Sequence, residues 1–322
     1  MQRLLGIGTL TEVIGLREEY KEIMILTTMH RLFLLYAICI TSLYSNAIGF
    51  IPDLKVGSGV FDYACEGYFK GITIPVYYYI PQSGAIDEMP ILFVMHGAHR
   101  NADNYRNHWI RKAEQYGIIV ISPQFDKEQF PSRMYQSGNV KSGKNAIRPS
   151  EQMTYRIIDD IFLSIKIKIR SRQKQYNLYG HSAGGQFVHR FTIFYDSKYV
   201  NEAIAANPGH YTFPYNHSPY PYGLSGIARA SDLPYEKIYG KKLTIMLGAA
   251  DTLRDSNLNT MREADMQGLN RLERGRNFFR ASEEHSNSLK STFNWKLTIV
   301  EGAGHSNRKM SLAAADRLYG SK

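Results

Sequence analysis

Short apolar runs alternate with longer segments of helical period from residue 70 onward. Runs rich in β-branched and aromatic residues predict strands at 72–80, 91–96, 118–122, 175–180, 202–207, 243–248 and 296–300. The segments between them predict helices at 104–116, 151–172, 183–195, 261–289 and 309–318. This alternation predicts the α/β class, with a mainly parallel central sheet covered by helices on both faces.

The segment 151–172 shows the helical period most plainly. Its apolar positions recur at helical spacing and share one face, at Ile157, Ile158, Ile161, Phe162, Ile165 and Ile169. Ser150 follows Pro149 and is placed to cap the first turn. We therefore expect a helix that begins directly after Ser150.

Two polar, turn-rich stretches, 126–150 and 208–240, interrupt the alternation. We expect both to be loop insertions at the carboxyl ends of strands, where an open α/β sheet builds its binding surfaces. Prolines and aromatic rings alternate in the second stretch, and Tyr211, Tyr215 and Tyr220 are the candidate substrate-binding residues. The alternative is that these rings only pack the loop onto the domain.

The N-terminal part contains the features of a secretory signal peptide. Met29-His30-Arg31 precedes an apolar run at 32–43, and Ser45-Asn46-Ala47 ends it with small residues. We predict cleavage after Ala47 and a secreted or periplasmic protein. The run is shorter than the roughly 20 residues that span a bilayer, so a permanent membrane anchor is the less favoured alternative.

The extension before Met29 is longer than signal peptides normally carry, which suggests that translation starts at Met24 or Met29. We therefore divide the chain into an extension with a signal peptide, 1–47, and a single domain, 48–322. Of the 2 cysteines in the sequence, Cys39 leaves with the signal and Cys65 has no internal partner.

Length and charge narrow the class further. A chain of 322 residues buries a large core, so disorder, collagen and a disulfide scaffold are excluded. The 39 Lys and Arg exceed the 29 Asp and Glu, but the excess is spread along the chain. Without zinc spacing, RNP-like strands or a helix-turn-helix pattern, we expect no nucleic acid partner. Without a His/Asp cluster at ligand spacing, we expect no catalytic metal. The arginine-rich segment 261–289, with Arg262, Arg271, Arg274, Arg276 and Arg280, predicts a solvent-exposed helix, with contact to an anionic polymer as the alternative.

The residues 180–184, Gly-His-Ser-Ala-Gly, follow a predicted strand and open a predicted helix. They fit G-x-S-x-G, in which a sharp strand-to-helix turn lifts the serine hydroxyl clear of the backbone. Ser182 is therefore the candidate nucleophile. The N–H of Ala183, at a helix N-terminus, is a candidate donor to a developing oxyanion.

A serine nucleophile needs a base, and the base needs an orienting carboxylate. Asp251 lies just past the predicted strand 243–248, and His305 just past the strand 296–300. Both follow Ser182 in the chain order that this architecture uses. Asp255 is the rival acid, four residues after Asp251.

The strand 91–96 ends in His-Gly, and Ala98 behind it is the candidate for the second oxyanion donor. We expect His96 to hold this loop and His181 to pack beside the nucleophile. Four further residues could border a substrate or be ordinary loop residues: His99, Arg100, His210 and His217.

Together these motifs resemble those of an α/β-hydrolase of the secreted esterase and polyester-depolymerase type, over about residues 60–320. The resemblance implies that Ser182 is the nucleophile, His305 the general acid and base, and Asp251 its orienting acid, with no metal or cofactor. Ala98-His99-Arg100 replaces the further glycines of the lipase and esterase pattern. The second oxyanion donor is the assignment that this departure affects.

The leading hypothesis is a secreted serine hydrolase that cleaves carboxylic esters through an acyl-enzyme. Aromatic residues in 208–240 favour feruloyl or acetyl esters of polysaccharide, and a polyester fits almost as well. A serine peptidase of the same fold and a secreted binding protein without turnover are the alternatives. The expected partner is a small-molecule or polymeric ester, and the oligomeric state is not predicted.

Overall fold

The computed structural model describes residues 21, 24–33, 51–143, 145–227 and 229–320. The chain divides into two compact units, Met1–Ile48 and Gly49–Lys322. In the first unit, residues 24–33 are helical. Most of the predicted signal run and the predicted cleavage site at Ala47 lie outside the described residues. Over the described ranges, no helix has both the length and the apolar character needed to cross a membrane.

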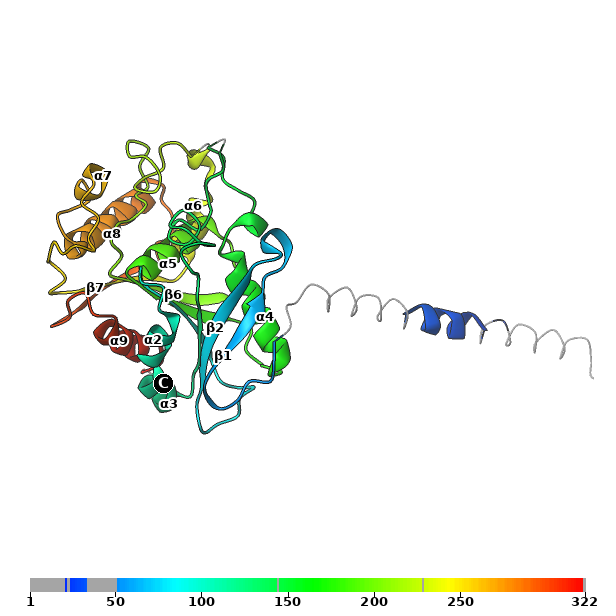
Figure 1. The fold of residues 1–322 in the computed structure, drawn as a ribbon. Helices are drawn as coiled ribbons and strands as arrows, with labels where there is room; N and C mark the ends of the chain where they lie inside the picture. The colour runs from blue at the N-terminus through cyan, green and yellow to red at the C-terminus, as the bar shows by residue number, and fades with distance from the viewer. Residues whose placement is uncertain (1–20, 22–23, 34–50, 144, 228, 321–322) are drawn as a thin grey trace, which may run out of the picture. The chain divides into compact units, whose positions relative to one another are not determined.

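Within the described part of the second unit, eight strands form one sheet in the order β1-β2-β4-β3-β5-β6-β7-β8 (Figure 1). Strands β1 and β2 pair antiparallel with their neighbours, and the pairs from β4 to β8 are parallel. The bounds are Gly57–Ala64 (β1), Thr73–Ile80 (β2), Ile91–Met95 (β3), Ile119–Pro123 (β4), Tyr176–His181 (β5), Val200–Ala206 (β6), Leu243–Gly248 (β7) and Lys296–Val300 (β8). The predicted mainly parallel sheet is confirmed.

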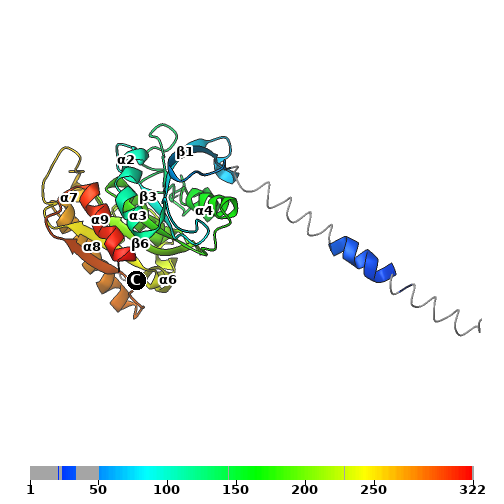
Figure 2. The same cartoon turned by 90° about the horizontal axis from the view of Figure 1, so that it is seen from below.

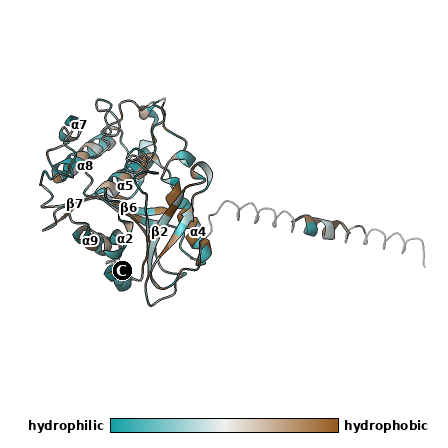
Figure 3. Ribbon diagram, in the orientation of Figure 1, coloured by the Kyte–Doolittle hydropathy of each residue, from teal (hydrophilic) through white to brown (hydrophobic). Residues whose placement is uncertain are grey.

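Helices cover both faces of this sheet, as predicted. One face packs against Ala102–Asn107 (α2), Ile110–Tyr116 (α3) and Asn307–Tyr319 (α9), which lie together in Figures 1 and 2. The other face packs against Arg156–Lys168 (α4), Ala183–Phe194 (α5), Tyr235–Gly240 (α6) and Arg271–Ser288 (α8). Strand β3 feeds both cores, since Phe93 and Val94 point to opposite faces. In Figure 3 the sheet contains both hydrophobic and hydrophilic residues, and α7 and α8 are largely hydrophilic.

The structure differs from the predictions mainly at element ends. The predicted helix 151–172 begins only at Arg156, because residues Ser150–Gln152 form a short 3-10 turn and Ser150 caps nothing. The segment 104–116 forms two helices, α2 and α3, separated at His108 and Trp109. The segment 261–289 is likewise divided into Arg262–Asp265 (α7) and α8, with Gly268 between them at φ 145°.

Apart from the short 3-10 turns and the helical residues 24–33, one strand and one helix were not predicted. Strand β1 alternates between exposed and buried positions, but its two glycines and an aspartate are poor strand formers, so its sequence pattern is weak. Helix α6 lies inside the insertion 208–240 and has only six residues. Neither element contributes a residue to the site described below.

Strands β5, β7 and β8 run parallel, so their carboxyl ends meet at one edge of the sheet. Paired residues show the alignment, since His181 lies beside Ala206 and Gly248 beside Val300. The loops that follow these strands carry Ser182, Asp251 and His305. The fold thus brings distant parts of the sequence together at this edge.

Candidate active site

Ser182 occupies the sharp turn between β5 and α5. Its backbone is strained, at φ 59° and ψ −116°, a region that residues other than glycine rarely adopt. The turn is crowded: a Cβ on Gly180 would overlap the carbonyl of Gly184, and one on Gly184 would overlap the carbonyl of Met95. The glycines of the motif are therefore required by the close approach of three chain segments.

Because the atom in the way is backbone, Gly184→Ala cannot be relieved by a side-chain rotation. We expect this variant to lose about 1–3 kcal/mol of unfolding free energy, the usual cost of overpacking a tight site. Urea unfolding measures the loss. Gly240→Ala is the matched control, since a Cβ there meets no atom within 4 Å. Equal stability of the two variants would contradict the packing described for the turn.

Ser182, His305 and Asp251 form one hydrogen-bonded chain. His305 Nε2 lies 3.1 Å from Ser182 Oγ, and His305 Nδ1 lies 2.8 Å from Asp251 Oδ2. Asp251 is buried, with 2% of its side chain exposed, whereas His305 is 21% exposed. The imidazole can therefore take a proton from the serine hydroxyl on one side while a buried carboxylate holds its other nitrogen.

Asp255, the rival acid, is paired elsewhere. Both of its carboxylate oxygens accept hydrogen bonds of 2.9 Å from the guanidinium of Arg271. This pairing holds the pKa of Asp255 below its usual value. Asp251 is therefore the acid that is hydrogen-bonded to His305, and Asp255 is the acid that is paired with Arg271.

Asn207, which was not among the predicted residues, ties the loops of the acid and the base together. Its side chain accepts from the N–H of Gly248 at 2.8 Å and donates to the carbonyl of Gly304 at 3.2 Å. Gly248 ends β7 and Gly304 precedes His305, so one buried amide fixes both loops. Asn207 has a positive φ of 43°, which asparagine tolerates better than most residues.

Two further histidines flank the site without joining its hydrogen-bonded chain. His181 is buried against the ring of His305, with centroids 4.6 Å apart, and burial lowers its pKa well below the usual value. His96 is buried, and its Nε2 accepts from the N–H of Phe125 at 3.0 Å. Burial lowers the pKa of His96 to about 3, so it is a neutral hydrogen-bonding group that holds the loop after β3.

Ala98 and Ala183 both line the cleft that contains Ser182. Ala183 is the first residue of α5, so its N–H has no partner within the helix. Ala98 lies in the turn after β3, which the carbonyl of Gly97 closes by accepting from the N–H of Arg100. Both predicted oxyanion donors are therefore at the cleft.

The cleft has a volume of about 410 Å³, and most of the residues that line it are polar. Besides Ser182, the two alanines and Arg271, its walls are Ser132, Arg133, Gln136, Ser137, Gln186, Gly209, His210, Pro221, Tyr222, Asn257 and Asn259. Residues of both stretches, 126–150 and 208–240, are in this lining. Tyr222 is the one aromatic ring other than His210 in this lining among the residues that the structure describes, so the aromatic residues of 208–240 that favoured feruloyl esters do not gather at this cleft.

The three tyrosines predicted to bind substrate do not line this cleft. Tyr211 is fully buried and stacks on Phe278 with ring centroids 4.6 Å apart. Tyr220 donates its hydroxyl to the carbonyl of Ser137, and Tyr215 stacks on His217. The alternative reading, in which these rings pack the loop onto the domain, describes them better.

The other candidate border residues also divide. His210 lines the cleft, whereas His99, Arg100 and His217 do not. Arg100 is buried and donates to the carbonyls of Phe125 and Phe130, so it holds the insertion 126–150. Of the five arginines expected on an exposed helix, Arg271 and Arg274 are buried, which corrects that prediction.

Arg190 of α5 holds the walls of the cleft together. No sequence motif predicted this role. It is fully buried and donates to Thr212 Oγ1 at 2.8 Å and to the carbonyls of Gln136 at 2.9 Å and Pro221 at 3.1 Å. Gln136 belongs to the segment 126–150, and Thr212 and Pro221 belong to the segment 208–240. One guanidinium thus joins both walls of the cleft.

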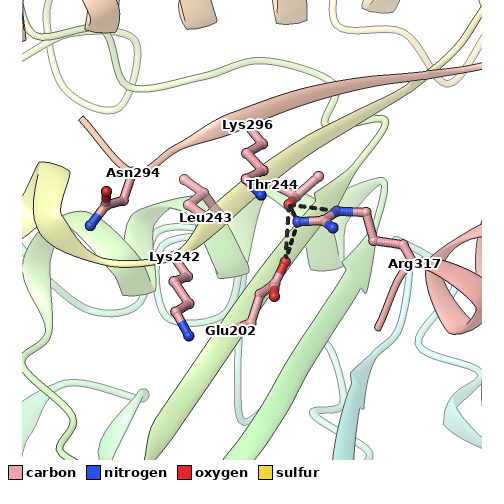
Figure 4. A pocket seen from close by; sticks show the side chains of 7 residues that line it. All are labelled: Glu202, Lys242, Leu243, Thr244, Asn294, Lys296 and Arg317. Carbon is pink, nitrogen blue, oxygen red and sulfur yellow. Dashed lines mark hydrogen bonds and ion pairs between the residues drawn. The ribbon is translucent and has the colours of Figure 1, made fainter. Parts of the chain in front are cut away.

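A different cavity, of about 240 Å³, lies at the opposite edge of the sheet, where β7 and β8 begin (Figure 4). Lys242, Lys296 and Arg317 line it, and Arg317 is paired with Glu202 at 2.7 Å. Its lining within the described ranges includes no serine, cysteine or histidine. The cleft at Ser182 is therefore the candidate active site. In the described part of the chain, no group of three or more His, Cys, Asp or Glu residues could hold a metal ion.

No protein-family model matches the chain, and no curated protein matches it. Among solved structures it is similar to poly(aspartic acid) hydrolase-1 from Sphingomonas sp. KT-1, at 37% identity and a TM-score of 0.75, over 83% of this chain and 100% of that one. It is also similar to a poly(3-hydroxybutyrate) depolymerase from Bordetella parapertussis, at 28% identity and a TM-score of 0.77, over 83% and 91% of the two chains.

An S-formylglutathione hydrolase from Agrobacterium tumefaciens shares the fold at 16% identity and a TM-score of 0.52, over 84% of this chain and 97% of that one. The parallel sheet with helices on both faces agrees with these neighbours. The relative at 37% identity is matched over its whole length. The chain therefore belongs to the α/β-hydrolase superfamily, in its family of esterases and depolymerases, and is a hydrolase.

Proposed function

We propose that this protein is a serine hydrolase that cleaves carboxylic esters, with Ser182 as nucleophile, His305 as general base and acid, and Asp251 as the orienting acid. The observation that carries the proposal is the continuous hydrogen-bonded chain from Ser182 Oγ through His305 to Asp251 Oδ2, which starts at a serine that lines a cleft. The strained turn at Ser182 supports it further, because strain of this kind exposes a nucleophile.

In the acylation step, Ser182 Oγ attacks the ester carbonyl carbon while its proton passes to His305 Nε2. The carbonyl oxygen becomes negatively charged and is stabilised by the N–H groups of Ala98 and Ala183. The bond to the alcohol oxygen then breaks, and His305 returns the proton to the departing alcohol. The products are a free alcohol and an acyl-enzyme on Ser182.

Deacylation repeats these steps with water as the nucleophile. His305 Nε2 takes a proton from the water as its oxygen attacks the acyl carbon, and the same two N–H groups stabilise the oxyanion. The bond to Ser182 Oγ breaks, and the serine regains its proton from His305. The carboxylic acid leaves, and Asp251 keeps the imidazole in the tautomer that both steps need.

The polar and cationic side chains in the lining favour an acyl group with polar or charged atoms over a large aromatic one. Arg133 is exposed at the cleft, and its guanidinium has no hydrogen-bond or ion-pair partner among the described residues. Gln186 and His210 lie in the same lining. An anionic group on the substrate would complement Arg133. Aliphatic polyesters remain candidates by similarity to the poly(3-hydroxybutyrate) depolymerase, and polysaccharide acetyl esters fit a polar cleft better than feruloyl esters do.

A second candidate function is amide hydrolysis in an acidic polymer. The relative at 37% identity is a poly(aspartic acid) hydrolase, and the cationic Arg133 in the cleft of this chain favours an acidic substrate. The same residues could serve, since a serine triad cleaves amides and esters through the same acyl-enzyme. Amide hydrolysis in an acidic polymer thus corresponds to the alternative of a serine peptidase of the same fold.

Turnover of four substrates separates these possibilities: p-nitrophenyl acetate, methyl ferulate, poly(3-hydroxybutyrate) and poly(aspartic acid). We expect hydrolysis of p-nitrophenyl acetate and slow or no hydrolysis of methyl ferulate. Cleavage of poly(aspartic acid) and not of the polyester would favour the amide candidate. If no substrate is cleaved, the protein fits the alternative of a binding protein without turnover.

We also propose that the protein is exported and that residues 48–322 form the mature domain. A host with a general secretion pathway should release a protein whose N-terminal sequence starts at Ile48, because Ala47 ends the small-residue segment after the apolar run. N-terminal sequencing of the purified protein measures this. Recovery of residues 1–28 on the protein would contradict cleavage and favour the anchored alternative.

A further inference from the structure

Arg271 is a buried cation at the edge of the cleft that contains Ser182. It is the first residue of α8, and only 1% of its side chain is exposed. A buried cation is unfavourable unless it is paired, so its contacts decide its role. Its two ionic partners, Asp251 and Asp255, both lie in the loop after β7.

Asp255 fixes the orientation of this guanidinium. The two bonds of 2.9 Å run in parallel from Nη1 and Nη2 of Arg271 to the two oxygens of Asp255, an arrangement that sets both distance and plane. Asp255 is itself held by the N–H of Asn257 at 2.9 Å. The Nε of Arg271 is buried without a hydrogen-bond partner among the described residues.

The side of Arg271 turned to Asp251 completes the surroundings of the triad acid. Nη1 lies 3.5 Å from Asp251 Oδ1, and no other group in the described ranges donates to that oxygen. The other oxygen, Oδ2, accepts from His305. The N–H of Leu272 also donates to the carbonyl of Asp251 at 3.3 Å, so the start of α8 contacts the acid through both backbone and side chain.

We propose that Arg271 is a positioning residue of the triad, held by Asp255, and that it keeps the carboxylate of Asp251 turned toward His305. This inference rests on the proposed function of Ser182, His305 and Asp251. Arg271 also offsets one of the two carboxylates in this loop, which leaves one net negative charge beside the imidazole. That charge stabilises the imidazolium that forms whenever His305 holds the serine proton.

A direct contact of Arg271 with an acidic substrate is the competing role, because the residue lines the cleft. Both terminal nitrogens of its guanidinium already donate to Asp255, and one of them also faces Asp251. The two roles differ in what they change: a positioning residue lowers kcat for every ester, whereas a substrate contact raises KM for anionic esters only.

The test is steady-state kinetics of the full chain and its variants with p-nitrophenyl acetate, a neutral ester. We expect Arg271→Ala to lower kcat about 100-fold, the scale of a small misplacement of a reacting group, with little change in KM. Asp255→Asn should lower kcat about tenfold, and the double variant should be no worse than Arg271→Ala, since the pair acts as one unit. Arg276→Ala, an exposed arginine of the same helix, is the control.

Two readouts separate positioning from a merely structural role. The groups with charge or titratable protons around His305 are Asp251 and Asp255 after β7, Arg271 of α8 and His181 of β5. Removing the cation should move the acid limb of the kcat/KM profile to higher pH, and Asp255→Asn should move it to lower pH. Added guanidinium ion should restore part of the kcat of Arg271→Ala and none of that of Asp251→Asn.

The inference is overturned if Arg271→Lys and Asp255→Asn keep the wild-type kcat, or if Arg271→Ala raises KM for an anionic ester alone. If Arg271→Ala lacks a cooperative thermal transition, it does not fold. The kcat values of Arg271→Lys and Asp255→Asn, compared with the wild type, then decide. Failure of the proposed function is a distinct result, because the wild-type protein would then show no turnover dependent on Ser182.

Discussion

Ser182→Ala is expected to lower kcat for p-nitrophenyl acetate by about four to six orders of magnitude, the range known for nucleophile removal from serine hydrolases. The hydroxyl lies 3.1 Å from His305 Nε2, and Ser182 directly precedes α5, so alanine removes the attacking atom and little else. Initial rates measured at several enzyme concentrations give the loss. Thermal unfolding should show a change of a few degrees at most.

The matched control is Ser231→Ala, which removes an exposed hydroxyl far from this loop in the sequence. It should turn over like the wild type. Activity of Ser182→Ala above about a tenth of wild type would exclude Ser182 as the nucleophile, since no triad enzyme retains that much without it.

Asp251→Asn has the second largest expected effect, about 10⁴-fold in kcat with the fold intact. The carboxylate accepts a hydrogen bond from the Nδ1–H of His305 at 2.8 Å, which leaves Nε2 free to take the proton of Ser182. An amide can donate to Nδ1 instead and stabilise the wrong tautomer. The pH–rate profile between pH 5 and about 9 measures the loss and shows whether high pH recovers part of it.

Asp255→Asn is the comparison that separates the two acids. Because Asp255 contacts Arg271 and not the imidazole, its replacement should cost about tenfold, far less than that of Asp251. The reverse order of the two variants would mean that Asp255 orients the base and that the positions of the two carboxylates exchange during the reaction.

Much of the fold follows from the sequence because buried parallel strands read as continuous apolar runs. Strands β3 and β7 are such runs, and both lie within one residue of their predicted bounds. Helix ends were less predictable, since a cap such as Ser150 competes with local turns that depend on tertiary contacts. The weak alternation of β1 is meaningful only once β2 is placed beside it.

The three triad candidates come from short motifs at strand ends, and the fold brings all three into contact because parallel strands end at one edge. The residues that form the cleft walls could not be predicted from sequence motifs in the same way. The rings of the segment 208–240 read as an aromatic surface, but Tyr211 packs inward on Phe278, and that choice depends on a helix far along the chain.

Arg271 illustrates the same limit for charged residues. In a segment with charges on several faces, an arginine is ordinarily solvated, and nothing local marks it as buried. Its burial depends on Asp255, which lies in a different loop and offers both oxygens at 2.9 Å. The sequence signal that could have found it is the second aspartate four residues after the triad acid, since a second carboxylate next to a buried one calls for a cation.

The central claim, that Ser182 is an activated nucleophile, is tested most directly by covalent labelling. A fluorophosphonate reacts only with a serine whose hydroxyl is activated by a neighbouring base. We expect mass spectrometry of the digested protein to show one adduct, on the peptide that contains Ser182, and to show none with Ser182→Ala or His305→Ala. An unlabelled wild-type protein, or an adduct on another serine, would contradict the account.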